Sequence, residues 1–174
     1  MPADAFVSQL NEQIANEFAA HQQYVACAVY YDDDTLPQLA GFFYRQAMEE
    51  RDHAMMMVQY LLDTDAPVQI PGVAAPAVAF DDVVAPIALA LEQEKRVSEQ
   101  INALAATARD ARDYSSEQFM QWFIKEQVEE VATMSDLLRW AQRSRDDVKD
   151  IEDYVAREQQ GEESDATAPR VAGA

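Results

Sequence analysis

Residues 39–60 decide the fold, and they read LAGFFYRQAMEERDHAMMMVQY. Inward positions of a bundled helix recur at alternating steps of three and four residues. These steps select one face of the stretch: Leu39, Phe43, Gln46, Glu50, His53, Met57 and Tyr60. The row is apolar at both ends and polar at its centre. It predicts a helix that buries a glutamate and a histidine in the middle of an apolar seam.

Three other stretches show the same arrangement. The row in the first is Leu10, Ile14, Glu17, His21, Tyr24 and Ala28. The row in the second is Val84, Ile87, Leu91, Glu94, Ser98, Ile101 and Ala105. The row in the third is Met120, Phe123, Gln127, Glu130, Met134, Leu137 and Ala141. The four rows predict four helices that each bury a glutamate. No row contains Lys or Arg, so we expect no basic side chain on the seams to compensate the buried charges.

The periodic segments predict an all-α protein. Four helices are expected at residues 5–32, 35–62, 81 or 82 to 109, and 113 or 115 to 144, and Thr35 is the predicted N-cap of the second. Helices one and two are joined by a short turn, as are helices three and four. Each pair is therefore expected to form an antiparallel hairpin.

The connection between the two hairpins is much longer, at about 18 residues. Extended, it reaches roughly 60 Å, whereas a helix of about 28 residues is roughly 42 Å long. The connection is therefore long enough to run the length of the bundle and to make helix three parallel to helix two. The expected fold is a four-helix bundle with one long crossover between helices two and three.

The C-terminal part divides into two segments. Val148, Ile151 and Val155 lie on one face of a short amphipathic segment, which predicts a fifth helix. Residues 159–174 contain Gly, Glu, Ser, Ala and Pro without large apolar side chains, which is typical of a disordered acidic tail. We therefore expect one domain over residues 1–158 and a tail over residues 159–174.

The four seam glutamates lie at matching depths in the predicted bundle. Glu17 and Glu50 are each about 15 residues from the turn between helices one and two. Glu94 and Glu130 are about 15 and 16 residues from the turn between helices three and four. All four carboxylates can therefore meet at one level. Alternatively, these rows are not the inward faces of the helices, and the glutamates face water. The matched depth of the glutamates in all four rows argues against this alternative.

Burying four carboxylates together costs several kcal/mol for each charge unless something compensates. Protonation relieves part of that cost, and bound cations relieve it better. Carboxylates with one imidazole suit iron or manganese, whereas zinc takes more nitrogen or sulfur ligands. The pattern therefore predicts a metal site inside the bundle.

Charge and composition exclude several other classes of function. The net charge is −19 with only 13 Lys and Arg, so nucleic acid is a poor partner, because phosphate binding needs basic patches. The acidic surface serves solubility or attracts cations. No apolar run is long enough to span a membrane, and the N-terminal residues do not resemble a signal peptide. The single cysteine, Cys27, forms no internal disulfide. We therefore expect a cytoplasmic protein.

Several motifs resemble those of bacterial non-haem ferritins, and the resemblance covers roughly residues 5–158. The motifs are Asn16-Glu17-Phe18 with Tyr24, Glu49-Glu50-Arg51-Asp52-His53-Ala54, Leu91-Glu92-Gln93-Glu94, Gln118-Phe119-Met120-Gln121-Trp122-Phe123 and Glu126-Gln127-Val128-Glu129-Glu130. Together these motifs are highly specific for that family, although Glu-x-x-His alone is not.

The resemblance implies a diiron site that oxidises Fe(II). One iron would be held by Glu17, Glu50 and His53. The second would be held by Glu50, Glu94 and Glu130, with Glu50 bridging and Gln127 close by. A third iron site would be formed by Glu49, Glu126, Glu129 and Glu130. Tyr24 would lie beside the diiron site, where it supplies a further electron or is a core tyrosine hydrogen-bonded to a glutamate.

The implied activity is that of an iron-storage ferroxidase. Two Fe(II) ions held side by side pass two electrons to O2 or H2O2, and the ferric product moves on to a mineral inside a hollow shell of 24 subunits. Neutral Gln127 lowers the ligand charge and would hold Fe(III) less tightly. Asp110, Asp113 and Glu117 are candidates for a pore of that shell.

Two departures from haem-binding bacterioferritins argue against haem. Those relatives use Glu-x-x-His twice, whereas the second pair here is Gln127-x-x-Glu130. They also carry a haem-ligating Met after the bridging glutamate, where this chain has Arg51. The alternatives are a cage subunit that oxidises iron poorly, a haem-bearing bacterioferritin and a different diiron oxidase. His21 is either a hydrogen-bond partner of the ligands or simple polar packing, and we favour packing.

Overall fold

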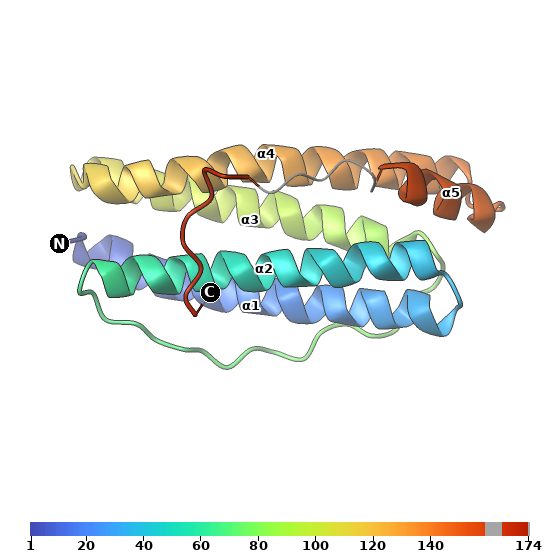
Figure 1. The fold of residues 1–174 in the computed structure, drawn as a ribbon, viewed down its shortest axis with the longest axis horizontal. Helices are drawn as coiled ribbons and strands as arrows, with labels where there is room; N and C mark the ends of the chain where they lie inside the picture. The colour runs from blue at the N-terminus through green and yellow to red at the C-terminus, as the bar shows by residue number, and fades with distance from the viewer. Residues whose placement is uncertain (159–164, 174) are drawn as a thin grey trace.

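The computed structural model describes residues 1–158 and 165–173, and in this part of the chain all regular structure is helical. The helices are α1 (Asp4–Asp33), α2 (Pro37–Asp63), α3 (Ala85–Asp110), α4 (Tyr114–Arg143) and α5 (Val148–Glu158). Figure 1 shows α1 to α4 side by side as a bundle, with α5 at one end. The predicted all-α four-helix bundle with a short fifth helix is confirmed.

The crossover between α2 and α3 runs the length of the bundle, so α3 is parallel to α2 as predicted (Figure 1). Two amide side chains of α1 hold it in place. Asn11 donates to the Pro67 carbonyl at 3.0 Å and accepts from the Gln69 N–H at 2.6 Å. Gln23 makes the same pair of bonds with Ala77, each at 2.9 Å. The crossover is thereby fixed along α1.

The start of α2 differs from the sequence prediction. Thr35 is not the N-cap, because it adopts a left-handed φ of 61° in the turn and Leu36 directly precedes the helix. The first N–H groups of α2 are satisfied from a distance instead. Glu152 of α5 accepts hydrogen bonds from the backbone N–H groups of Gln38 at 3.0 Å and Leu39 at 2.8 Å. A carboxylate from another helix therefore caps α2.

The predicted starts of α3 and α4 are close to the observed ones. Helix α3 begins at Ala85, slightly later than expected, because the Asp82 side chain accepts from the N–H groups of Val84 and Ala85, both at 2.9 Å. Helix α4 begins at Tyr114, between the two predicted starts at residues 113 and 115, and Asp113 caps it by accepting from the Ser116 N–H at 3.1 Å.

The apolar core is divided into two clusters at opposite ends of the bundle. The cluster near α5 includes Phe43, Met134 and Ile151, and the other includes Phe6 and Met120. The four seam glutamates are buried between the two clusters, with exposed fractions of at most 6%. This division matches the predicted rows, which are apolar at both ends and polar in the middle.

The C-terminal residues differ in part from the expected disordered tail. Residues 165–173 cross the bundle from α4 toward α2 (Figure 1), and the Ala172 N–H donates to the Met55 carbonyl at 3.2 Å. Ala168, Val171 and Ala172 pack against the apolar cluster of Phe6 and Met120. These small apolar side chains provide enough contact to hold the segment on the bundle. The rest of the expected tail, residues 159–164, lies outside the described residues.

No helix within the described ranges is long and apolar enough to cross a bilayer.

Candidate metal centre

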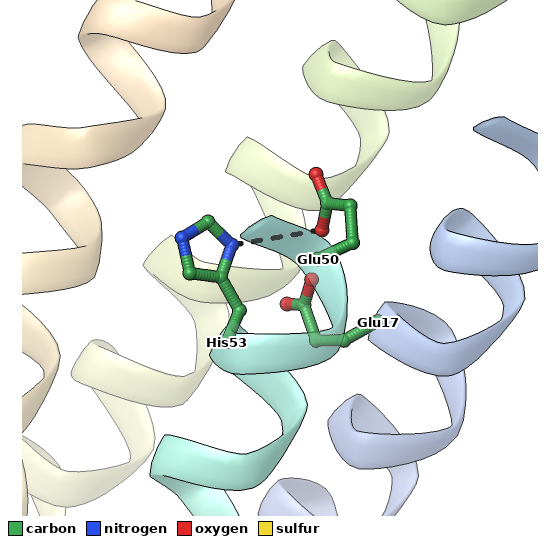
Figure 2. Close-up of side chains that lie close together, drawn as sticks. All are labelled: Glu17, Glu50 and His53. Carbon is green, nitrogen blue, oxygen red and sulfur yellow. Dashed lines mark ion pairs between the residues drawn. The ribbon is translucent and has the colours of Figure 1, made fainter. Parts of the chain in front are cut away.

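The centre of the bundle brings together the first predicted ligand set. Glu17 of α1 and Glu50 and His53 of α2 each offer a ligand atom, and these atoms lie within 4.8 Å of one another. Figure 2 shows their side chains pointing toward one another, with His53 Nδ1 3.6 Å from Glu50 Oε2. The i, i+3 spacing places Glu50 and His53 on the same face of α2. All three side chains are buried.

Glu94 of α3 and Glu130 of α4 complete the group from the other hairpin. Both are buried, and Glu94 accepts a hydrogen bond from the Tyr24 hydroxyl. Ser98 ties the second pair of helices together, since its hydroxyl contacts the Glu94 carbonyl at 2.8 Å and donates to Gln127 Oε1 at 3.0 Å. All seven residues predicted around the diiron site therefore lie in one region at mid-bundle: Glu17, Tyr24, Glu50, His53, Glu94, Gln127 and Glu130.

Five buried carboxylate oxygens in this region have no hydrogen-bond partner in the described part of the chain. They are Glu17 Oε2, both oxygens of Glu50, Glu94 Oε2 and Glu130 Oε2. Buried polar atoms are normally paired, and each unpaired one costs about 1–3 kcal/mol. Convergent unpaired oxygens with one imidazole are the donor set that iron and other hard cations require.

The electrostatics of the centre also favour binding of a cation. Burial raises the pKa of Glu50 and Glu130 well above the usual range, and the nearby Glu94 carboxylate raises both further. Burial likewise raises the pKa of Glu94, to about 7. The pKa of His53 is lowered, because burial disfavours the imidazolium. A neutral imidazole is the form that binds a metal, and a bound cation would favour the ionised carboxylates.

The third predicted site lies beside the first two, in an acidic cavity of about 690 Å³. Its wall includes all four carboxylates expected there: Glu49, Glu126, Glu129 and Glu130. His53 also lines it, so the cavity extends from the surface to the edge of the group formed by Glu17, Glu50 and His53. Burial raises the pKa of Glu126, and the charge of Glu129 raises it further.

Two neighbouring side chains, Trp122 and His21, lie close to the ligands or to the helices that carry them. The Trp122 ring, part of a motif shared with bacterial non-haem ferritins, lies 5.7 Å from the His53 ring, edge to face. His21 Nδ1 is 2.6 Å from the Ala47 carbonyl, so this histidine joins α1 to the backbone of α2. That contact is polar packing, the alternative favoured from sequence.

Two positioning residues were missed by the sequence analysis. Gln13 donates to Glu17 Oε1 at 2.8 Å, and the only sequence signal for this bond was the i, i+4 spacing. Gln46 was recognised as a seam residue but not as part of the site. Its side-chain amide donates to Glu49, and it also bonds to Glu130 and lowers the pKa of that carboxyl. Gln46 therefore links the cavity to the buried glutamates of the bundle centre.

A four-helix bundle with one long crossover and inward-facing carboxylates is the architecture of ferritin-like diiron proteins. The ferritin-like domain family matches residues 7–144, and the chain belongs to this family. The resemblance inferred from the sequence motifs is thereby confirmed.

Named relatives agree with this assignment. The chain is 54% identical over 168 residues to ferritin BfrB of Mycolicibacterium smegmatis, covering 97% of this chain and 93% of the relative. It is 34% identical over 138 residues to a bacterial non-heme ferritin of Staphylococcus aureus, covering 79% of this chain and 83% of the relative. An open pore ferritin of Archaeoglobus fulgidus superposes with a TM-score of 0.86 at 26% identity, covering 92% of this chain and 99% of that structure.

Proposed function

We propose that the protein stores iron and oxidises Fe(II) at the diiron site within each subunit. The observation that carries the proposal is the set of five unpartnered carboxylate oxygens that converge beside a neutral histidine. Glu17, Glu50 and His53 hold one Fe(II), and Glu50, Glu94 and Glu130 hold the other. Hard anionic carboxylates bind Fe(III) more strongly than Fe(II), so they favour the oxidation.

The reaction consumes Fe(II) and either O2 or H2O2. Two Fe(II) ions each give up one electron. With O2, two electrons and two protons yield H2O2; with H2O2, two electrons and two protons yield two molecules of water. Because Gln127 is neutral, the site has one negative charge fewer than it would have with a glutamate at position 127. Product Fe(III) is held less tightly and moves on through the acidic cavity, where Glu49, Glu126, Glu129 and Glu130 form the third site.

Tyr24 occupies a position suited to donating a further electron. Its hydroxyl hydrogen-bonds to the ligand Glu94, so the proton released on oxidation has an acceptor. Burial raises the pKa of Tyr24 well above 10, and the charge of Glu94 raises it further, which keeps the hydroxyl protonated at rest. The hydrogen bond alone also fits a core tyrosine, and Tyr24→Phe distinguishes the two roles through the oxidation rate.

The product mineral is stored in a cage of 24 subunits. The support for this assembly is membership of the ferritin-like family, and size exclusion of the purified protein tests it. We expect no haem, because Arg51 follows Glu50 and pairs with Asp52 at 2.7 Å. A haem absorption band in the purified protein would contradict this expectation. The cytoplasmic location stays a prediction.

Anaerobic Fe(II) loading followed by exposure to air tests the proposed activity. The unaltered protein is expected to bind two Fe(II) per subunit at the diiron site and to oxidise both rapidly. Replacing Glu50 and His53 together by Ala should slow the oxidation by about a hundredfold, as loss of metal ligands and their partners does. Glu92→Ala is the matched control, because it removes an exposed carboxylate two residues from Glu94. Wild-type oxidation rates in the double variant would refute the site assignment.

A further inference from the structure

Asp165 of the C-terminal segment lines the acidic cavity together with Glu126, Glu129 and Glu130. It therefore adds a fifth carboxylate to the four assigned to the third site. Its Oδ1 accepts from the Thr167 N–H at 2.8 Å and from the Thr167 hydroxyl at 2.6 Å. These two bonds lower the pKa of Asp165, so the carboxylate is ionised.

The other oxygen of Asp165 faces α4. Its Oδ2 accepts from the Trp122 indole N–H at 3.1 Å and from the Lys125 ammonium at 3.2 Å. The Lys125 ammonium is also 3.6 Å from Glu129 Oε1. One monovalent cation therefore lies between two carboxylates of the cavity wall, where a multivalent ion would interact more strongly with both.

Two buried oxygens in the same wall favour binding of a cation in the cavity. Gln46 Oε1 and Glu130 Oε2 have no hydrogen-bond partner within the described residues, and both residues are 6% exposed. Both line the cavity that Asp165 lines. An amide oxygen and a carboxylate oxygen are ligands suited to a hard, oxygen-binding cation. These oxygens, and not the abundance of acidic residues, indicate that an ion binds here.

We propose that Asp165 is an additional ligand for cargo iron in this cavity, and that Lys125 occupies the position until an incoming ion displaces its ammonium. The C-terminal segment is then part of the path between the diiron site and the surface. Thr167 and Trp122 keep Asp165 in place when the ammonium leaves, because their three hydrogen bonds do not involve Lys125. The identity of the ion rests on the proposed function, whereas the site itself does not.

Terbium(III) is a suitable probe, because it is a hard trivalent ion with no redox chemistry in water and its emission is sensitised by a nearby indole. The sequence has two tryptophans, so Trp140→Phe leaves Trp122 as the single sensitiser. The Glu50→Ala and His53→Ala replacements remove terbium binding at the neighbouring diiron site. In this background, indole-sensitised emission reports the cavity that contains Asp165.

Asp165→Asn and Lys125→Gln are expected to act in opposite directions. Asp165→Asn removes the negative charge and keeps one acceptor oxygen, which can still accept from Thr167, whereas the amide nitrogen cannot accept from Trp122. The substitution should weaken terbium binding about tenfold. Lys125→Gln removes the competing cation and should tighten binding several-fold. Asp153→Asn is the matched control, since Asp153 pairs with Lys149 at 2.9 Å on α5, away from the cavity, and should leave the affinity unchanged.

The opposite effects of the two substitutions on terbium affinity distinguish a metal ligand at Asp165 from an ion pair that is only structural. If the Lys125–Asp165 pair only held the segment on the bundle, both substitutions would weaken terbium binding together. That result, or an unchanged affinity in Asp165→Asn, would overturn the proposal. Because the assay needs neither iron nor oxidation, a negative result leaves the proposed ferroxidase activity intact. Failure of the unaltered protein to oxidise Fe(II) would instead contradict the proposed function alone.

Discussion

The ends of the bundle bury aromatic and aliphatic side chains, whereas its centre buries four glutamates and a histidine. At the ends, residues such as Phe43, which contacts the rings of Tyr24 and Tyr31, contribute burial and packing. At the centre, carboxylates have lost water and have gained too few hydrogen bonds. The ends therefore stabilise the fold, and the centre uses part of that stability to hold ligands in place. Four predictions test this division.

The largest effect is expected at an apolar end. Phe43→Ala should destabilise the protein by about 4 kcal/mol, because it removes a fully buried ring from between three aromatic neighbours. Thermal unfolding without iron measures the loss, which corresponds to a midpoint lower by roughly 10 °C. Tyr44→Ala, at an exposed neighbouring position, is the control. Equal effects of the two substitutions would contradict the assignment of Phe43 to the core.

The second effect is a pH dependence that originates at the centre. The folded pKa of Glu94 is about 7, above its ordinary value of 4.5, so the folded state binds the extra proton more tightly than the unfolded state. Stability without metal should therefore fall as pH rises from about 4.5 to about 7, by on the order of 3 kcal/mol. Thermal midpoints across this range measure it. Bound cations should reverse the trend, and a flat profile without metal would contradict the prediction.

The third prediction reverses the usual effect of a core substitution. Glu130→Gln removes a buried ionisable carboxyl group, keeps the shape of the side chain and should stabilise the metal-free protein by about 1–2 kcal/mol at a pH high enough to ionise that carboxyl. The same change should weaken iron binding, because the ligand loses its charge. Thermal unfolding and an anaerobic Fe(II) titration measure the two effects. A variant that is less stable without metal would show that the buried carboxylate stabilises the fold.

The smallest effect concerns the link between α5 and the start of α2. Glu152→Ala removes the carboxylate that accepts from the Gln38 and Leu39 N–H groups and should cost about 1 kcal/mol. Fe(II) oxidation should be unaffected, because Glu152 lies outside the diiron site. Thermal unfolding measures the cost, and Glu158→Ala, an exposed position at the end of the same helix, is the control. A slower oxidation rate in Glu152→Ala would contradict the view that the end of the bundle contributes to stability and not to the activity of its centre.

The sequence predicted the fold and the buried positions of the four seam glutamates because both depend on local periodicity. Steps of three and four placed Glu17, Glu50, Glu94 and Glu130 on the inward faces, and helix rise placed them at one level. The predicted cap at Thr35 was wrong because capping depends on which acceptor is nearest in space. Glu152 is more than a hundred residues away along the chain. No local pattern connects these two positions.

The composition of the C-terminal residues predicted disorder, yet Asp165 lies beside Trp122 and lines the cavity next to the diiron site. By itself, the sequence determined the four helices, their seams and the inward positions of the candidate ligands, because the positions of inward side chains follow from helical geometry. Only the tertiary structure decided which oxygens have no partner, where the carboxylate cap of α2 comes from and what lies over the cavity. Those properties depend on contacts between segments that are distant in sequence.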